Sequence, residues 1–491
     1  MVDPFDSSKF KDFEASVDFQ TASSSLAATS SFSKLPYSIL SSREKYFMVA
    51  LLSASGIWST LATSIYFPAL PVIAEKFHVS TEAVNLSVVA YLLFQGVCPT
   101  LLASVSDHYG RRPCVIGCLV SYSGVCVAIS RCNAYWLLAF LRCLQAGTIA
   151  SLISVSSGVI GDMSIISHRG KFVGLVSGIQ LLGQGFGALL GAGIVTHWGW
   201  RGIFVFLAIG SGFVGIIAFL MLPETNRSLV GNMSIIPTNF WNKLPILSLS
   251  YFSSRLLDDK ETKEPVTPIR LFGSWKIIAE KEVFFALLPG SFQFATWTMS
   301  LTTLSTNLQA DYNYSTMHVG ACYLAPGLGT LVGAVLTGRI IDWVYKRRKA
   351  QYDYKYTHLS ESERPEFDLL RARLDFAAIP TILLIIFSVV FGWCLDKKLS
   401  VVPILISLFF ISCCAVSFMS ASTTLLIDMY PGQGSAATSC MNLLRCWIGA
   451  IGVGVLQKMV NKMGEGGTYT LMAGLCLMSG LSLVFVVKKR N

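Results

Sequence analysis

The chain has 491 residues, with 38 Lys and Arg against 28 Asp and Glu, and a formal net charge of +10. Apolar residues make up 53% of it and charged residues only 13%, where about 25% is usual in soluble domains. A soluble chain of this length would need more charge to cover its surface, which excludes an ordinary cytosolic enzyme, a disordered protein and a nucleic-acid-binding protein.

Residues 1–45 form a polar, Ser-rich segment that includes the run TASSSLAATSSFS at 21–33. It has no basic start followed by an apolar run, so it is not a cleaved signal peptide. We interpret it as a disordered cytosolic tail.

From residue 46 onward, apolar stretches recur that are each long enough to cross a hydrocarbon core of about 30 Å. They predict an all-α integral membrane protein with two six-helix bundles, at 46–222 and 284–487, a central cytosolic linker at 223–283 and a short tail at 488–491. The predicted spans are 46–70, 82–105, 113–131, 134–160, 170–195, 201–222, 284–307, 316–342, 376–395, 401–427, 435–459 and 467–487.

The distribution of basic residues predicts the orientation in the membrane. With the N-terminus inside, the cytosolic tails and loops contain 28 Lys and Arg, and the external loops contain 7. Because Lys and Arg accumulate on the cytoplasmic side, both termini are expected in the cytosol.

A sequence pattern recurs at the same point of each half. Ala103-Ser-Val-Ser-Asp107 is followed by HYGRRP, with Arg111 and Arg112, and Gly338-Arg-Ile-Ile-Asp342 is followed by WVYKRR. Repeated halves are typical of secondary transporters. A carboxylate at a helix end can accept charge-assisted hydrogen bonds from a basic residue or from helix N-terminal amides. We therefore predict a conformational switch at Asp107, Arg111, Arg112 and Asp342, against the alternative of a plain basic loop.

Two arginines fall well inside predicted spans. Arg142 lies about 12 Å into the fourth span, with Gln145 one turn away as a plausible hydrogen-bonding neighbour. Arg445 and Asn442 lie in the eleventh span. A buried Arg must face protein or water, so we assign these four residues to proton coupling or substrate binding. For Arg142, snorkelling to the external surface is the alternative.

Glycines recur every four residues in the fifth span, at Gly170, Gly174 and Gly178 and then at Gly183, Gly187 and Gly191. The lack of side chains on one face lets a neighbouring helix approach closely, so a packing role is predicted, above all for the last four of them.

Aromatic and amide side chains on spans 1, 2, 4, 5, 7, 8, 10 and 11 are predicted to line a substrate cavity, since such groups suit a mixed polar and apolar ligand. Each could instead face lipid. The candidates are Trp58, Tyr66, Gln95, Gln180, Gln184, Gln293, Trp297, Tyr323 and Phe418.

Several ordered motifs resemble the major facilitator superfamily, and specifically the fungal twelve-span drug:proton antiporters of the quinidine-resistance and dityrosine-transporter type. They run in order across about 380 residues and include IYFPALPVIAEKF, VNLSVVAYLLFQG, SDHYGRRP, LRCLQAG, GWRGIF, LPETNRSLVGN, CYLAPGLG, GRIIDWVYKR and NLLRC.

The resemblance implies a major facilitator fold with pseudo-twofold symmetry. It also implies that Asp107, Arg111 and Arg112 govern conformational switching and that Arg142 takes part in proton coupling. The chain departs from the family pattern at Ala103, where Gly is usual, and at Gly187-Ala188, where Gly-Pro is usual. Both changes keep small residues, but they weaken the use of the glycine motif as evidence of antiport.

Together these observations predict export of a small organic molecule by alternating access, in exchange for protons. The partners would be the substrate, protons and the lipid bilayer, with no nucleic acid, cofactor or metal, and the protein would be a monomer in the plasma membrane. Vacuolar or prospore membranes are alternatives, as are a uniporter, an exporter of an amino-acid derivative such as dityrosine, and a non-transporting sensor. No nucleophile constellation, phosphate loop or HExxH motif indicates an enzyme.

The predicted spans have no central carboxylate to oppose Arg142 and Arg445. Two positive charges in a low-dielectric cavity would repel a cation. A neutral or anionic substrate is therefore expected.

Overall fold

The computed structural model describes residues 37–164, 166–235, 237, 239–243, 273–357, 365, 367, 371, 375–430 and 434–489. The features below all belong to one contact unit, residues 38–491. Most of the predicted tail and of the predicted central linker lie outside the described residues.

The first membrane helix, α2, spans Ser42–Ser64 and starts before the predicted span. A capping box fixes this start, because the Ser41 hydroxyl accepts the Glu44 amide hydrogen bond and the Glu44 carboxylate accepts that of Ser41. The Ile39 amide also donates to the Asn232 carbonyl at 3.2 Å. The prediction of disorder is therefore wrong for residues 38–45.

The first half continues with six more helical elements. They are η1 (Phe67–Ala69), α3 (Leu70–Phe77), α4 (Thr81–Tyr109), α5 (Arg111–Arg131), α6 (Tyr135–Met163) and α7 (Ile166–Met221). The 56 residues of α7 would extend about 84 Å if straight, but its backbone is not helical at Gly199, with φ 70° and ψ 177°. Gly199 separates the predicted fifth and sixth spans.

The second half is also built of helices. Between the halves lie α8 (Arg227–Val230), η2 (Phe240–Asn242) and α10 (Gly273–Ala279). The second half itself contains α11 (Lys281–Ala310), α12 (Thr316–Cys322), α13 (Leu324–Lys355), η5 (Asp375–Ala377), α15 (Ala378–Asp396), α16 (Val401–Met429) and α17 (Gly434–Lys489). Gly464 interrupts α17 with φ 70° and ψ 177°, as Gly199 interrupts α7.

Within the described residues, nine helical stretches are long and apolar enough to cross a membrane. Two of them contain the interruptions at Gly199 and Gly464, and α11 adds a further helix of 30 residues. Dividing α7 and α17 at these glycines and adding α11 yields one helical segment for each of the twelve predicted spans.

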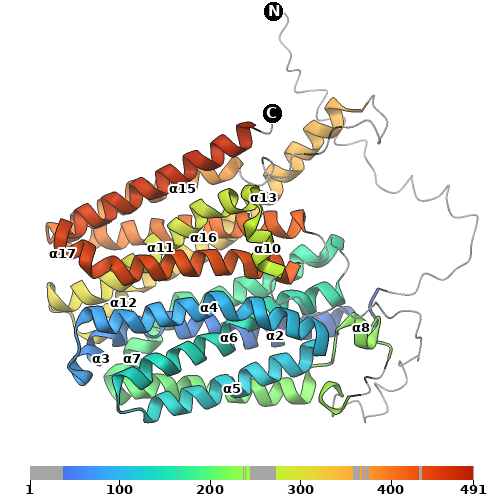
Figure 1. Cartoon of the computed structure of the whole chain (residues 1–491), viewed down its shortest axis with the longest axis horizontal. Coiled ribbons are helices and arrows are strands. Elements are labelled where there is room, and N and C mark those ends of the chain that lie inside the picture. Colours follow the sequence, from blue (N-terminus) through green and yellow to red (C-terminus); the bar gives the residue numbers. More distant parts are fainter. Residues whose placement is uncertain are drawn as a thin grey trace, which may run out of the picture. The chain divides into compact units, whose positions relative to one another are not determined.

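The helices pack as two bundles, coloured blue to green for the first half and yellow to red for the second (Figure 1). In the first bundle α2 and α5 pack on α7, and α4 packs on α6. In the second, α11 and α15 pack on α17, and α13 packs on α16.

The two most extensive contacts between the bundles are those of α4 with α17 and of α7 with α13. The first pair contains predicted spans 2 and 11, and the second pair contains predicted spans 5 and 8. A twofold axis that exchanges the halves would exchange spans 2 and 8 and spans 5 and 11, so it would map one interface onto the other. The contacts therefore agree with the predicted pseudo-twofold symmetry.

Part of the glycine motif on α7 packs closely against α2. A Cβ built at Gly183 would lie 2.8 Å from the Ile57 carbonyl oxygen, and one at Gly191 would lie 3.0 Å from the Ile65 carbonyl carbon. At Gly187 the neighbour is Ser64. At Gly178 a Cβ would meet nothing within 4 Å, so the predicted packing role is wrong there.

Large apolar side chains remain exposed on the outer faces of the helices. On α7 they include Ile209, Phe213 and Ile216, with exposed fractions of 68%, 63% and 62%. An apolar surface of this kind is stable against lipid tails but not against water. The outer faces are thus suited to a bilayer.

Candidate functional site: buried arginines and the interface between the bundles

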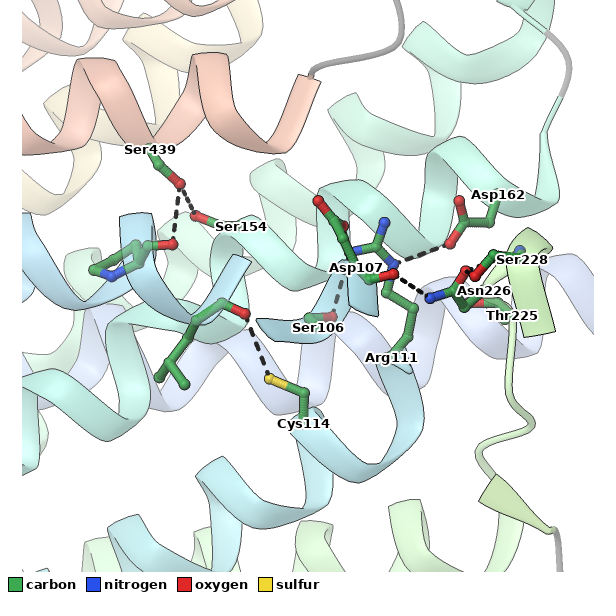
Figure 2. A network of polar contacts seen from close by, with 12 residues as sticks. Ser106, Asp107, Arg111, Cys114, Ser154, Asp162, Thr225, Asn226, Ser228 and Ser439 are labelled. Carbon is green, nitrogen blue, oxygen red and sulfur yellow. Dashed lines mark hydrogen bonds and ion pairs between the residues drawn. The ribbon is translucent and has the colours of Figure 1, made fainter. Parts of the chain in front are cut away.

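Arg111 lies in a cluster of side chains where the end of α4, the start of α5 and the end of α6 meet (Figure 2). Its guanidinium forms an ion pair with Asp107, one turn earlier, and its Nε donates to Asp162 Oδ2 of α6 at 3.0 Å. It also donates to the Ser106 hydroxyl at 3.3 Å. We call Ser106, Asp107, Arg111 and Asp162 the Arg111 cluster. The predicted charge-assisted contact of Asp107 is confirmed.

Gly158 leaves the space that the Arg111 guanidinium occupies. A Cβ at this position of α6 would lie 2.7 Å from the guanidinium carbon. The cluster therefore depends on a residue without a side chain as well as on its charges.

Glu224, just after α7, binds the exposed amides at the start of α5. Its carboxylate accepts hydrogen bonds from the amides of Arg111 at 2.8 Å and Arg112 at 3.2 Å, and from those of Thr225 and Asn226. A carboxylate suits this place because the first amides of a helix lack partners and carry partial positive charge. Burial raises the pKa of Glu224, and the four amide bonds oppose that rise.

Gly110 allows this arrangement. It adopts φ 117°, in the region that favours glycine, and a Cβ there would collide with the Glu224 carboxylate. The side chain of Asn226 adds a hydrogen bond to the Asp107 carbonyl at 2.7 Å. The segment after residue 222, predicted to be linker, is in this part folded against the first bundle.

The guanidinium of Arg112 donates to the carbonyls of Leu222 at 2.9 Å, Phe219 at 2.6 Å and Trp241. It therefore connects the start of α5 to the end of α7 and to η2. The side chain of Asp342, its predicted counterpart in the second half, lies outside the described residues.

Arg142 is buried within the first bundle, with 1% of its surface exposed. Its guanidinium lies between two aromatic rings, 4.0 Å from the centroid of Tyr66 and 4.2 Å from that of Tyr91. Gln145 Oε1 accepts its hydrogen bond at 2.6 Å, as predicted. The snorkelling alternative is wrong, because cation–π contacts and an amide replace water around this charge.

Among the described residues, no carboxylate pairs with Arg142 and its Nε has no hydrogen-bond partner. An arginine keeps its charge at physiological pH. Arg142 thus presents a permanent positive charge with one unused donor.

Arg445 and Asn442 lie at the interface between the bundles. Asn442 Oδ1 accepts hydrogen bonds from Arg445 at 3.0 and 2.6 Å, while its amide donates to the Gln95 carbonyl of α4 at 2.5 Å. The Arg445 guanidinium also lies 5.0 Å from the Phe294 ring centroid. Asn442 thereby connects the second arginine to the first bundle.

A second contact between the bundles lies closer to the Arg111 cluster. The Ser439 hydroxyl of α17 lies 3.1 Å from that of Ser154 on α6 and donates to the Pro99 carbonyl at 3.3 Å (Figure 2).

The other end of the bundle, which we call the Phe67 end, also joins the two halves. Phe67 stacks on Tyr323 with ring centroids 6.0 Å apart, and its carbonyl accepts a hydrogen bond from Ser305 of α11 at 2.7 Å. Gly185 of α7 and Gly327 of α13 meet backbone to backbone nearby. The halves are thus in contact at this end.

None of the nine predicted cavity residues is exposed. Seven are buried, and Trp58 and Gln184 are half-buried. Five of them have a buried polar atom with no hydrogen-bond partner in the part of the chain that the structure describes, namely Trp58, Gln95, Gln180, Gln293 and Trp297. Unpartnered polar atoms are unfavourable in an interior and are satisfied when a ligand pairs with them.

The packing of individual members differs. Tyr66 contacts Arg142, Phe418 packs on Gly290, and the Gln180 amide packs on Gly56. They occupy the interior of both bundles, and their role in substrate binding stays a prediction.

Sequence reasoning missed Glu224, Asp162 and Tyr91 as parts of these sites. Glu224 lies within the quoted run LPETNRSLVGN, so a signal was present, but it is 113 positions from Arg111. For Tyr91, nothing along the chain indicates that its ring faces Arg142.

Comparisons with known proteins agree with this architecture. The family model described as "Major Facilitator Superfamily" matches residues 52–352. The chain is 46% identical over 453 residues to "MFS antiporter QDR2" of Candida albicans, covering 92% of this chain and 90% of the relative. It is 42% identical over 461 residues to "Multidrug transporter AQR1" of Candida glabrata, covering 93% and 78%.

A solved structure has the same fold. The human organic anion transporter MFSD10 (TETRAN) aligns with a TM-score of 0.60 at 16% identity, over 89% of this chain and 99% of that one.

Proposed function

The chain belongs to the Major Facilitator Superfamily, and on this premise we propose that it exports drug-like small organic molecules by alternating access in exchange for protons. Several of its relatives are named antiporters or multidrug transporters. It is thus a secondary active transporter and not an enzyme, and small organic molecules are its substrate class. The single observation that carries the proposal is the 46% identity with a named antiporter over 92% of the chain.

Alternating access requires contacts that break and reform at the ends of the two bundles. The Arg111 cluster joins α4, α5 and α6 through Arg111 and its two carboxylates. Because its groups are charged and partly shielded from water, a small shift of α4 against α6 changes its energy strongly. We propose that this cluster favours one conformation of the first bundle.

Arg142 supports proton coupling in an indirect way. Since it stays charged, it cannot itself carry the transported proton. Its charge instead lowers the proton affinity of any group that enters its surroundings, because a nearby cation favours the deprotonated form of an acid. The proton would then be carried on the substrate or by water near Arg142.

The same charge supports a neutral or anionic substrate. Arg142 and Arg445 both have neutral amide partners, Gln145 and Asn442, so neither charge is compensated by an ion pair in the described residues. A carboxylate on the ligand could form paired hydrogen bonds with a guanidinium. A permanently cationic ligand would be repelled.

We place the protein as a monomer in the plasma membrane with both termini in the cytosol. The excess of basic residues in the tails and in the loops of that side supports the orientation. A transporter that exports foreign compounds has to lie in the membrane that bounds the cell, which supports the plasma membrane.

The proposal is tested with the full chain in proteoliposomes under an imposed pH gradient. Substrate movement should follow the gradient, reverse when the gradient is reversed, and stop when a protonophore collapses it. Flux that follows only the substrate gradient would establish a uniporter and refute proton exchange. Matched acidic, neutral and basic ligands in the same vesicles test the substrate charge, and a strong preference for the basic ligand would refute the anion argument.

A further inference from the structure

A cavity of about 290 Å³ lies at the Phe67 end of the protein. It is formed where α3, the first turn of α4 and the last turn of α11 meet. The 29 residues of α4 separate it from the Arg111 cluster by about 40 Å. It is therefore distinct from the Arg111 cluster.

Each helix contributes one face to the cavity, through residues four positions apart that lie on the same side of a helix. Two of its walls come from the first bundle and the third comes from the second. These residues are Leu70 and Ala74 on α3, Thr81 and Asn85 on α4, and Thr306 and Ala310 on α11.

The described lining is apolar with a few neutral polar groups and no charged side chain. Asn85 is 4% exposed. Gln309, the remaining amide, has its Nε2 shielded from solvent and without a hydrogen-bond partner among the described residues. A buried donor without an acceptor is unfavourable, and a ligand oxygen at this point would remove that cost.

From this geometry we propose that the cavity is a second binding site, for a small, uncharged, mainly apolar molecule whose oxygen accepts a hydrogen bond from Gln309. Charged ligands are disfavoured because no opposite charge lines the cavity. Because its walls come from both bundles, the bound molecule contacts α3 and α4 on one side and α11 on the other. The proposal rests on the lining of this cavity and on the unpartnered Gln309 donor, and not on the export function proposed above.

Benzophenone, a neutral aromatic ketone that reacts with nearby C–H bonds on irradiation, is a suitable probe. The purified full chain in lipid nanodiscs is irradiated with increasing benzophenone, and the labelled residues are mapped by peptide mass spectrometry. Saturable labelling is expected within 70–85 and 306–310.

Two variants test the cavity itself. Ala310→Phe fills it and should abolish the saturable labelling. Gln309→Leu keeps much of the volume but removes the donor and should weaken apparent binding about fivefold. Gln457→Leu on α17, whose amide bonds Asn461 at the protein surface, is the matched control and should change nothing.

Folding of each variant is checked by gel filtration and thermal unfolding, and Ala74→Leu replaces Ala310→Phe if the latter misfolds. Labelling that rises linearly with concentration and is unaffected by filling would reflect partition into lipid, and would overturn the proposal. Equal labelling of Gln309→Leu and wild type would overturn the assigned hydrogen bond.

Discussion

At the scale of the residue, the surroundings of Arg142 suit a guanidinium group in particular. Its planar guanidinium fits between the rings of Tyr66 and Tyr91 while it donates to Gln145. A lysine ammonium is compact and strongly hydrated, and cannot stack in this way. Charge alone is therefore not sufficient at this position.

We predict that Arg142→Lys slows transport about tenfold, the equivalent of about 1.4 kcal/mol, at unchanged abundance in the membrane. Initial rates in proteoliposomes are the measurement. Arg131→Lys, at an exposed position on α5, is the control. A normal rate for Arg142→Lys would show that only the charge matters.

Removal of both carboxylates of the Arg111 cluster should cost more stability than the two single substitutions would together. Asp107→Asn leaves Asp162 as a partner of Arg111, so we predict impaired transport with near-normal thermal stability. The double variant with Asp162→Asn leaves a buried, unpaired guanidinium and should lose about 3 kcal/mol of unfolding free energy. Asp353→Asn, exposed at the end of α13, is the control. Normal flux in Asp107→Asn would exclude a switching role.

At the scale of the element, α5 depends on a residue outside it. Glu224 accepts the amides of Arg111 and Arg112 and so caps the N-terminus of α5 from the far end of α7. We predict that Glu224→Ala lowers the free energy of unfolding by about 2 kcal/mol, because buried amides lose their acceptor. Thermal unfolding in detergent measures this, with the exposed Glu75→Ala as control. An unchanged transition would show that other groups or water cap α5.

Burial raises the pKa of Glu224 in the folded protein, which gives stability a defined pH dependence. The folded state then favours the protonated carboxyl. The contribution of this carboxyl group to the free energy of unfolding is complete below the ordinary Glu pKa of about 4.3. It is lost as the pH rises through the higher pKa of the folded state. The stability of wild type relative to Glu224→Gln should therefore fall with rising pH. Parallel pH curves for the two proteins would contradict this.

At the scale of the whole molecule, alternating access requires the bundles to separate where they now touch. The Ser154 and Ser439 hydroxyls are 3.1 Å apart across the interface, so cysteines at both positions can approach disulfide geometry. We predict that oxidised Ser154→Cys/Ser439→Cys loses transport and regains it on reduction, while each single variant stays active. Mass spectrometry identifies the bond. Transport that persists in the cross-linked protein would show that this contact does not open.

What the sequence determined by itself is local along the chain. The spans follow from runs of apolar residues matched to membrane thickness, and Gly199 and Gly464 interrupt α7 and α17 between predicted spans. The Asp107–Arg111 pair follows from one helical turn, and Gln145 beside Arg142 from the same spacing. The ordered family motifs added the two-bundle fold.

Only the tertiary structure decided which distant side chains meet. The cap of α5 by Glu224, the ring of Tyr91 over Arg142 and the Ser154–Ser439 contact join residues 113, 51 and 285 positions apart. Such pairs depend on how each helix is rotated and how deeply it packs, and in a membrane nearly every helix face is apolar, so periodicity does not reveal the rotation. Gly178 and Gly183 carry the same signal in the sequence, yet only Gly183 lies against α2, because the packing of the whole bundle determines where two helices approach.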